Sequence, residues 1–516
     1  MMFPEASIIH LAIVAAGATV LYTFGLVIWR LYYSPLARFP GPKIAAATLW
    51  YEFYWDVLKK GQWVWEIDRM HREYGPIVRI NPYELHIRDS EFYDELYSGK
   101  QVKYLWWTKL AGSDRSTFAT VSSEEHRRRR GALNPFFSKR SVTGLEPIFR
   151  EKIGKLCRRL DRFIETGEVV RLDVALMATT IDIICDVGFA ADRGYLDEPD
   201  FKLEWKDTVA GVCETGAMAR HLPWLLAPMQ KLPRFIIDVI NPGFGILLKW
   251  HDITRKQIRP ILAYEDDMSY SKSRKTIFHT LRDSDLPAHE KTVERFVDEA
   301  ATFTIAGSET TAQATAKIMF FLKYLPDVLV KLRRELREAI PNPSQMIPNV
   351  ELQNLPYLAA VIYEGLRLSP IMVRLPRVAQ EPMQYKEWVI PPGTPVSETP
   401  YFVLMDPEIF PDPKRFRPER WLEATDQGIR LDRYMVLFGK GSRQCAGINL
   451  ARAEIFELAA KLIMRYDWEF AREYDLSDAY DGRDAFVMHA KLDDIGLYVT
   501  MQKAGDPEKS RSPLCG

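Results

Sequence analysis

The strongest constraint on this chain is a single cysteine, Cys445, in a glycine-rich run that leads directly into a segment of apolar periodicity. Residues 449–465 repeat apolar side chains at spacings of three and four, which predicts a helix beginning just after the cysteine. The unpaired N–H groups and the positive dipole end of a helix N-terminus favour a thiolate. Gly441 and Gly447 permit backbone turns and close approach that a Cβ would block. This arrangement predicts a thiolate that a metal can bind.

Three interpretations of this run are possible, and the flanking residues decide among them. A buried free thiol beside a helix is the usual environment of a lone cysteine. A dinucleotide fingerprint starting at Gly439 and Gly441 would need glycine at position 444, which is Gln, and no Cys-x-x-Cys pair for zinc occurs. Arg443 can offer a forked donor to a carboxylate such as a haem propionate. The run therefore favours haem ligation through the sulfur of Cys445.

The ten residues from Phe438 to Gly447 resemble the cysteine-loop signature of the cytochrome P-450 family, Phe-x-x-Gly-x-Arg-x-Cys-x-Gly, at every fixed position. The resemblance implies the cytochrome P-450 fold, with a buried haem b whose iron has a thiolate as its axial ligand. It assigns Cys445 to the iron. It also assigns Phe438, Arg443 and Gly447 to cofactor binding.

An uncharged, apolar stretch occupies the N-terminus. From Ala6 to Trp29 there is no Asp, Glu, Lys or Arg, and the stretch is long enough to cross about 30 Å of hydrocarbon. A cleaved signal peptide is the alternative, but no basic region precedes the stretch, and apolar residues continue beyond the small residues at 16–18. Basic residues follow it, so we expect residues 1–30 to be a single-pass anchor with the catalytic body in the cytosol. The proline-rich residues 31–45 predict a stiff hinge, as in members of the family in the endoplasmic reticulum membrane.

Length and composition set wider limits. The chain has 516 residues, of which 69 are Lys or Arg and 69 are Asp or Glu, so no net charge indicates nucleic acid as a partner. Its five cysteines are widely spaced and odd in number, which argues against a disulfide framework and for a reducing compartment. We place one catalytic domain at residues 46–505 and a flexible C-terminal tail at residues 506–516.

Local patterns predict a helix-dominated α+β body. Residues 74–90 alternate apolar and polar side chains, and residues 383–396 form a second strand-like patch that ends in a Pro-Pro-Gly turn. Most of the remainder has helical periodicity. The predicted helices are 145–166, 174–190, 291–322, 325–339, 355–369 and 449–465. The fold class is therefore α+β, mostly helical with small sheets.

Several basic residues match positions that hold the haem propionates in the family. His126 and Arg130 are four residues apart, so they share one face of a helix. They resemble the family's Trp-x-x-x-Arg pair, which binds a propionate. Pro376-Arg377 resembles a Pro-Arg step whose arginine meets a propionate. The resemblance thus adds His126, Arg130 and Arg377 to the cofactor-binding residues.

Two other charged groups have roles outside the chemistry. Glu364 and Arg367 lie three residues apart and resemble the family's Glu-x-x-Arg pair, which joins Arg420 to support the haem-binding core. A basic face for an acidic redox partner is a further expectation, with an ordinary solvated helix face as its alternative. The residues of this expected face are Arg127, Arg128, Arg129, Lys139 and Arg140.

The segment from Ala306 to Thr311 has low helix propensity inside a long helical pattern. Glycine in a helix interior costs up to about 1 kcal/mol relative to alanine, and Gly307 permits a local opening. An acid beside a hydroxyl can relay protons to a buried oxygen species. The segment resembles the family's Ala-Gly-x-Asp/Glu-Thr-Thr motif, which implies that Thr310 acts in dioxygen protonation with Glu309 as the relay acid.

The resemblance implies a monooxygenase that inserts one atom of O2 into a hydrophobic substrate. No dinucleotide or flavin fingerprint occurs, so electrons are expected from a separate NADPH cytochrome P-450 reductase in the same membrane. The quoted motifs are most similar to fungal secondary-metabolite members, including those that oxidise trichodiene, which favours a terpenoid or polycyclic substrate. The expected substrate-contact segments are 104–107, 296–303, 371–373 and 486–488. A reductase-independent isomerase or peroxygenase and a noncatalytic haem- or sterol-binding membrane protein are the alternatives.

Overall fold

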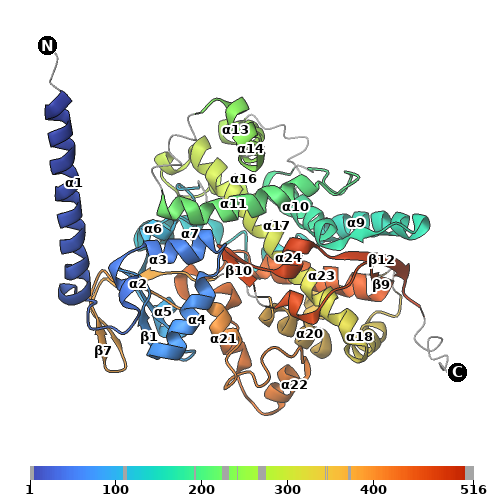
Figure 1. Ribbon diagram of the computed structural model, residues 1–516. Helices are drawn as coiled ribbons and strands as arrows, with labels where there is room; N and C mark the ends of the chain where they lie inside the picture. The colour runs from blue at the N-terminus through green and yellow to red at the C-terminus, as the bar shows by residue number, and fades with distance from the viewer. Residues whose placement is uncertain are drawn as a thin grey trace.

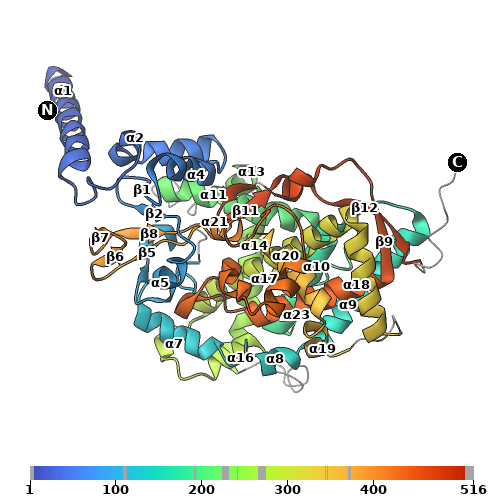
Figure 2. The same cartoon turned by 90° about the horizontal axis from the view of Figure 1, so that it is seen from below.

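A computed structural model describes most of the chain. The described residues are 5–108, 113–190, 193–222, 232–240, 242–264, 275–342, 345, 347–369, 373–480 and 482–505. The predicted tail at 506–516 and two of the expected substrate-contact residues, Ile371 and Met372, lie outside them. The body is mostly helical with small sheets (Figures 1 and 2), which confirms the predicted fold class.

Long helices build the core of the body. They are α9 (Glu146–Thr166), α10 (Leu172–Phe189), α11 (Leu203–His221), α14 (Pro242–Ala263), α17 (Val293–Tyr324), α18 (Pro326–Ala339), α20 (Pro356–Arg367) and α23 (Ile448–Arg465). α17 runs through the middle of the body and packs against α10, α14, α20 and α23 (Figure 2). Residues 172–185 of α10 are all buried. The six helices predicted from periodicity are confirmed, with ends shifted by a few residues.

Shorter helices complete the helical layer around this core. They are α2 (Lys43–Ala47), α3 (Trp50–Phe53), α4 (Trp63–Tyr74), α5 (Tyr93–Ser98), α6 (Leu105–Thr108), α7 (Ser123–Leu133), α8 (Lys139–Thr143), α13 (Arg234–Ile240), α16 (Ile277–Arg282), α19 (Asn349–Gln353), α21 (Pro400–Leu404), α22 (Glu419–Asp426) and α24 (Lys491–Ile495). α7 carries a Ser122 cap, whose side chain accepts a hydrogen bond from the Glu125 N–H. Such a cap satisfies one of the free N–H groups of the first turn.

The largest sheet of the described residues has the strand order β1-β2-β8-β5-β3. Its strands are β1 (Ile77–Arg79), β2 (Leu85–Ile87), β8 (Pro395–Ser397), β5 (Arg377–Val378) and β3 (Val102–Lys103). Smaller sheets join β6 (Met383–Tyr385) to β7 (Trp388–Ile390), β10 (Gly482–Ala485) to β11 (Val487–Ala490), and β4 (Val170–Arg171) to β12 (Tyr498–Lys503) and β9 (Tyr466–Phe470). Both predicted strand regions are confirmed. The register places Lys103 directly opposite Arg377.

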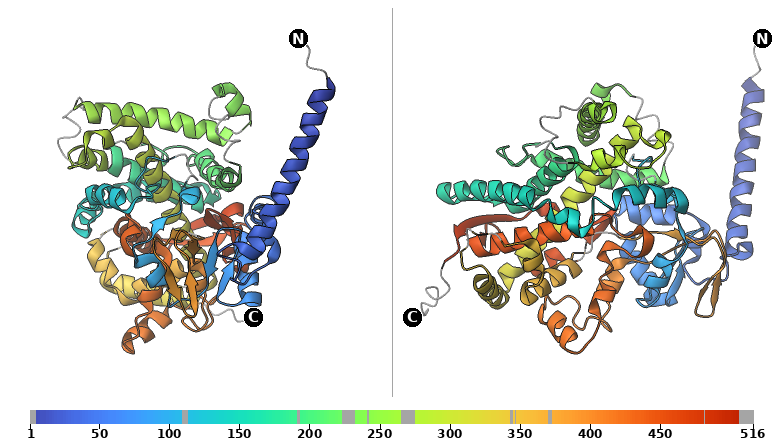
Figure 3. Two further views of the ribbon diagram at one scale, coloured as in Figure 1. Left: turned by 90° about the vertical axis from the view of Figure 1, so that its left-hand side faces the viewer. Right: turned by 180° about the vertical axis from the view of Figure 1, so that it is seen from behind.

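The N-terminal helix α1 (Glu5–Ile28) stands away from the body (Figures 1 and 3). The stretch His10–Tyr33 is helical, has a mean hydropathy of 2.2 and has no buried part, so its length and composition suit a membrane span. The helix continues as the π-helical turn Trp29–Tyr33, past the predicted boundary at residue 30. It ends at Ser34, just before Pro35.

A fully buried ion network lies between α20 and α22. The Glu364 carboxylate accepts two hydrogen bonds from the Arg367 guanidinium, at 2.8 and 3.0 Å, and one from Arg420 Nε at 3.1 Å. Trp421 Nε1 and the Arg417 N–H donate to the same carboxylate, each at 3.0 Å. Each of the two guanidinium groups therefore has a carboxylate partner, as expected for a supporting network.

Candidate active site

The cysteine loop folds as sharp turns ahead of α23. The Cys445 N–H donates to the Phe438 carbonyl at 2.9 Å, and α23 begins three residues later at Ile448. Gly439 and Gly441 both have φ of +67°, a left-handed conformation that favours glycine. A Cβ on Gly441 would lie 2.4 Å from the Tyr97 carbonyl oxygen, so only glycine fits there. A Cβ on Gly447 would meet no described atom within 4 Å.

Cys445 has a free thiol with accessible surface. Burial by the surrounding protein nevertheless raises the pKa of this thiol. The Gly447 N–H and the nearby Arg130 guanidinium act in the opposite direction and lower the pKa. The Arg130 guanidinium also donates to the Cys445 carbonyl at 3.3 Å. The helix-end environment predicted from the sequence is present, but burial outweighs it in the free thiol.

A group of basic side chains surrounds this loop, which we name the cationic cluster. Its members come from β3, α7, β5 and the cysteine loop; they are Lys103, His126, Arg130, Arg377 and Arg443. Among the described residues, no carboxylate lies within 4.0 Å of any of their side-chain nitrogens. The register that puts Lys103 opposite Arg377 is unfavourable for two like charges. Charges of one sign are thus held together without a partner of the other sign.

The pKa values in the cationic cluster reflect this excess of positive charge. Burial and the surrounding Arg443, Lys103, Arg130 and Arg377 lower the pKa of His126 to about 3. Burial, followed by Arg377 and Arg443, lowers the pKa of Lys103 well below its ordinary value. Burial and Arg377 lower the pKa of Arg443 to about 10. An anionic group placed here would relieve these repulsions.

The donors of the cationic cluster also hold backbone carbonyls. Arg443 donates to the carbonyls of Thr120 at 2.6 Å and Val121 at 2.8 Å. Lys103 Nζ donates to the Phe118 carbonyl. Arg443 in this structure therefore positions the segment before α7, a contact that the sequence did not predict.

The predicted cofactor residues come together around Cys445, and one further residue joins them. His126, Arg130, Arg377 and Arg443 all lie in the cationic cluster, while the partly buried Phe438 contributes its carbonyl to the Cys445 N–H. Lys103 was missed, because it closes a two-residue strand that has no periodic signal. Only the strand register reveals its position.

Thr310 lies near the middle of α17, where its hydroxyl donates to the Ala306 carbonyl at 2.7 Å. The helix is continuous from Val293 to Tyr324, so the local opening that Gly307 permits is not present. A Cβ on Gly307 would lie 3.1 Å from Ile184 Cγ1. This glycine instead lets α10 approach α17 closely.

Glu309 lies in a buried, charged environment. Its buried carboxyl borders a cavity of about 10 Å³ that Asp173, Lys206 and Asp493 also line. Burial raises the pKa of Glu309, while Lys206 and His489 oppose the rise. No hydrogen bond joins the side chains of Glu309 and Thr310 in the part of the chain that the structure describes. The relay between them stays a prediction.

The residues present fit a haem group with a thiolate ligand. Cys445, the one exposed thiol among the described cysteines, suits iron, and guanidinium and ammonium groups without carboxylate partners suit the two propionates of haem. The basic face expected for a redox partner is present in part: Arg127, Arg128, Lys139 and Arg140 are exposed. Arg129 is a correction, because it is half-buried and forms ion pairs with Glu125 at 2.6 Å and Glu290 at 2.9 Å.

Comparison with known proteins identifies the family of the chain. A family model described as cytochrome P-450 matches residues 46–497. The tryptophan 6-hydroxylase fscE of Fusarium equiseti is 40% identical over 488 residues, covering 94% of this chain and 96% of that protein. The cytochrome P-450 monooxygenase TRI4 of Trichoderma arundinaceum is 41% identical over 491 residues, covering 93% and 92%. The N-acetyltryptophan 6-hydroxylase ivoC of Emericella nidulans is 39% identical over 494 residues, covering 94% and 96%.

The family model spans most of the chain, and these fungal relatives span nearly all of it. The predicted family and its likeness to fungal secondary-metabolite enzymes are confirmed. The family implies a haem-thiolate cofactor, O2, a redox partner and a hydrophobic substrate. The chain belongs to the cytochrome P-450 family and is a monooxygenase.

Proposed function

We propose that this monooxygenase holds haem b between Cys445 and the cationic cluster and inserts one oxygen atom into a hydrophobic secondary metabolite. The observation that carries this proposal is the set of buried and partly buried basic side chains beside Cys445 that have no carboxylate partner among the described residues. Leaving charges buried and unpaired is unfavourable, so their arrangement requires an anionic ligand. The two propionates of haem supply that charge. Lys103, Arg130, Arg377 and Arg443 would bind them, with His126 as a neutral neighbour.

Haem with a thiolate ligand supplies the activation of O2. The protein's own groups would govern protons and water around that reaction. Thr310 would hold a proton at its hydroxyl, and Glu309, whose pKa burial raises, would resupply that proton from the cavity that Lys206 also lines. Because the carboxyl and the hydroxyl are not bonded to one another, this resupply requires a side-chain rotation or a bridging water.

Three neighbouring rings, Trp107, Phe118 and Phe486, which we name the aromatic group, support the proposal of a hydrophobic substrate. The Phe486 ring lies 5.2 Å from the Trp107 ring and 6.0 Å from the Phe118 ring. Phe486 also has φ of +70°, an unusual conformation for a bulky residue that is typical of functional sites. A flat or polycyclic molecule, terpenoid or aromatic, suits such a wall. Two relatives are named for hydroxylating tryptophan or its N-acetyl derivative, so aromatic amino-acid derivatives belong among the candidate substrates.

Electrons would come from an NADPH cytochrome P-450 reductase in the endoplasmic reticulum membrane. The exposed Arg127, Arg128, Lys139 and Arg140 offer a basic surface to an acidic partner. The apolar stretch His10–Tyr33 would anchor the chain in that membrane, with the body in the cytosol.

Replacing Cys445 tests the cofactor assignment. Cys445→Ser removes the sulfur donor at nearly constant size, so the reduced carbon monoxide adduct should lose its red-shifted thiolate absorption. Single replacement of Cys157, Cys185 or Cys213, which are buried free thiols, should leave the absorption unchanged. Retention of the band in Cys445→Ser would overturn the assignment.

Turnover separates the proposed monooxygenase from its alternatives. The purified protein should consume NADPH and form product with purified reductase and a fungal metabolite extract. Product formation without reductase would support an isomerase or peroxygenase, and binding without any product would support a noncatalytic carrier.

A further inference from the structure

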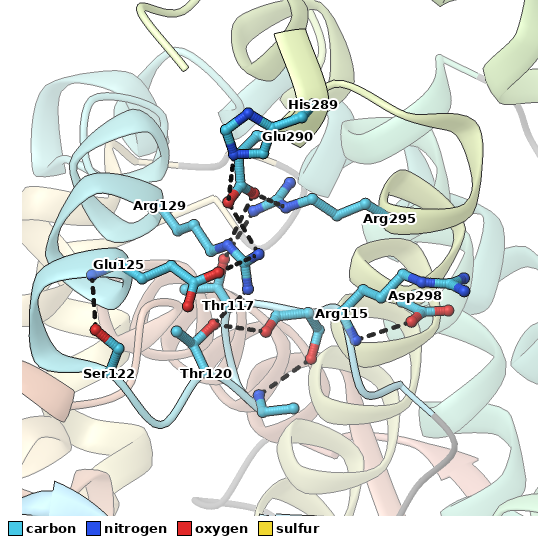
Figure 4. A network of polar contacts seen from close by, with 12 residues as sticks. Arg115, Thr117, Thr120, Ser122, Glu125, Arg129, His289, Glu290, Arg295 and Asp298 are labelled. Carbon is cyan, nitrogen blue, oxygen red and sulfur yellow. Dashed lines mark hydrogen bonds and ion pairs between the residues drawn. The ribbon is translucent and has the colours of Figure 1, made fainter. Parts of the chain in front are cut away.

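Residues 113–122 connect the aromatic group to two separate parts of the active site. The segment lies between α6 and α7, and Figure 4 shows it beside the N-terminal half of α17. Its Phe118 ring is perpendicular to that of Phe486 at 6.0 Å and lies 3.9 Å from Lys103 Nζ. Because Phe118 contacts both the aromatic group and Lys103 of the cationic cluster, the position of the segment affects both.

Two neighbouring carboxylates of α17 hold this segment. Glu299 Oε2 accepts hydrogen bonds from both the N–H and the hydroxyl of Thr117, each at 2.9 Å. Asp298 Oδ2 accepts from the Arg115 N–H at 3.0 Å (Figure 4). Glu299 is fully buried, so its two bonds to Thr117 form where water does not compete.

The opposite side of the segment is held by basic groups. Arg443 of the cysteine loop donates to the carbonyls of Thr120 and Val121, and Arg129 Nη1 donates to the Thr120 hydroxyl at 2.7 Å. Figure 4 shows Arg129 and Arg295 both directed toward Glu290. The segment therefore lies between α17 and the cysteine loop, bonded to both.

The ion pair of Glu299 with Arg295 does not use all of the hydrogen-bonding capacity of the Glu299 carboxylate. Arg295 lies 3.4 Å from its Oε2, but Arg295 has a shorter contact of 2.8 Å to Glu290. Glu299 Oε1 has no hydrogen-bond partner although it is buried. The short hydrogen bonds of this carboxylate are those from Thr117, while Arg295 acts on it as a nearby charge, so its direct hydrogen bonds go to the segment.

We propose that Glu299, assisted by Asp298, is a positioning residue that fixes residues 113–122 on α17 and so sets the place of Phe118 in the substrate pocket. This inference rests on the proposed function of that pocket. Thr310 lies on the same continuous helix. Through Glu299, Phe118 is held on the same helix that carries the Thr310 hydroxyl. The position of a substrate against Phe118 is therefore fixed relative to Thr310.

Glu299→Ala tests the proposal in the full-length, haem-loaded protein. Loss of a hydrogen bond to a charged group should speed amide hydrogen exchange in residues 113–122 by about tenfold. The Kd of 4-phenylimidazole, which must fit beside Phe118, should rise by about tenfold. The Kd of imidazole, which reaches the iron without touching that wall, should change less than about twofold. The carbon monoxide spectrum of the haem-loaded variant should be unchanged, because Cys445 is not altered.

Two further variants keep the test decisive. Glu294→Ala makes the same change on an exposed turn of α17 and should alter none of these quantities. Thr117→Val removes one donor at constant shape and should reproduce the ligand effect at a few-fold. Unchanged exchange in residues 113–122 of Glu299→Ala would overturn the proposal, as would equal weakening of both ligands. If the wild-type protein lacks the thiolate band, the proposed function fails, whereas the exchange measurement still tests the positioning role.

Discussion

The ion network at Glu364 is buried and the cationic cluster at Cys445 is buried in part, but the two differ more in how their charges are compensated. Around Glu364, the guanidinium groups of Arg367 and Arg420 share a carboxylate. In the cationic cluster, no member has a carboxylate partner among the described residues. The first arrangement satisfies itself within the protein, while the second requires a charge from outside.

This difference separates a supporting network from the proposed binding site. Burial of a charge is tolerated when its partner is also present, so compensated charges stabilise the fold without needing a ligand. Uncompensated charges raise the free energy of the protein alone and lower it when an anion binds. The comparison therefore predicts opposite results for variants of the two groups.

Breaking the compensated network should have the largest effect. Glu364→Ala leaves two buried guanidinium groups without their carboxylate and should lower the free energy of unfolding by about 3–5 kcal/mol. Urea unfolding of the purified protein measures this. Glu419→Ala is the control: its ion pair with Lys331 at 2.7 Å is half-exposed, so the loss should stay below about 1 kcal/mol. Equal losses in the two variants would contradict the supporting role.

Weakening the uncompensated cluster should reduce haem retention and spare the fold. Lys103 on β3 lies opposite Arg377 on β5, so Lys103→Met and Arg377→Met each remove one of two facing like charges. The haem-free protein should unfold at an unchanged or higher urea concentration. Each variant should lose haem to excess apomyoglobin about tenfold faster, because one charge-assisted contact is gone. A destabilised haem-free protein with normal haem retention would show that the cluster is structural.

Thr310 of α17 is a third case, in which a substitution should change neither stability nor haem content. Its hydroxyl donates only to the Ala306 carbonyl of its own helix, so Thr310→Ala should leave stability and haem content near normal. Product per NADPH should fall by about tenfold while NADPH use continues, because proton delivery is misdirected and hydrogen peroxide is released. Product, NADPH and peroxide are measured together with purified reductase. Unchanged coupling would remove Thr310 from the proposed proton path.

Local sequence predicted the parts of this site that a short motif specifies. The cysteine loop requires left-handed glycines at fixed spacing, and Glu364 and Arg367 are neighbours on one helical face. Such features follow from bonds within a few residues. They could therefore be read before the fold was known.

Contacts between distant segments could not be read in this way. Lys103 enters the cluster through its register with Arg377, and Glu299 meets Thr117 from far along the chain. A run of four arginines likewise does not reveal that Arg129 turns inward while Arg127 and Arg128 stay exposed. Tertiary packing decides each case, and no local periodicity encodes it.

The smallest expected effect is a pH dependence that belongs to the cationic cluster. The pKa of His126 is about 3 in the folded protein and near 6.5 when unfolded. Between these values the unfolded chain binds a proton that the folded chain does not, so stability falls as the pH falls from 6.5 toward 3. Above pH 6.5 the imidazole is neutral in both states and contributes nothing. His126→Phe should therefore reduce the loss of stability that the haem-free protein shows as the pH falls. Urea unfolding midpoints at pH 7.5, 5.5 and 4.5 measure this loss.

Haem makes this last prediction specific to the cluster. Propionates bound there would neutralise the cations that depress the pKa of His126, so the effect of His126→Phe on the acid-side slope should shrink in the haem-loaded protein. His251 is a matched control: burial is the main cause that lowers its pKa to about 4, as it is for His126, but its charged neighbours are Arg255 and Asp252 and not the cationic cluster. His251→Phe should flatten the slope equally with and without haem. If haem leaves the His126 contribution as large as before, the cationic cluster does not receive the propionates, and its excess charge needs another anion.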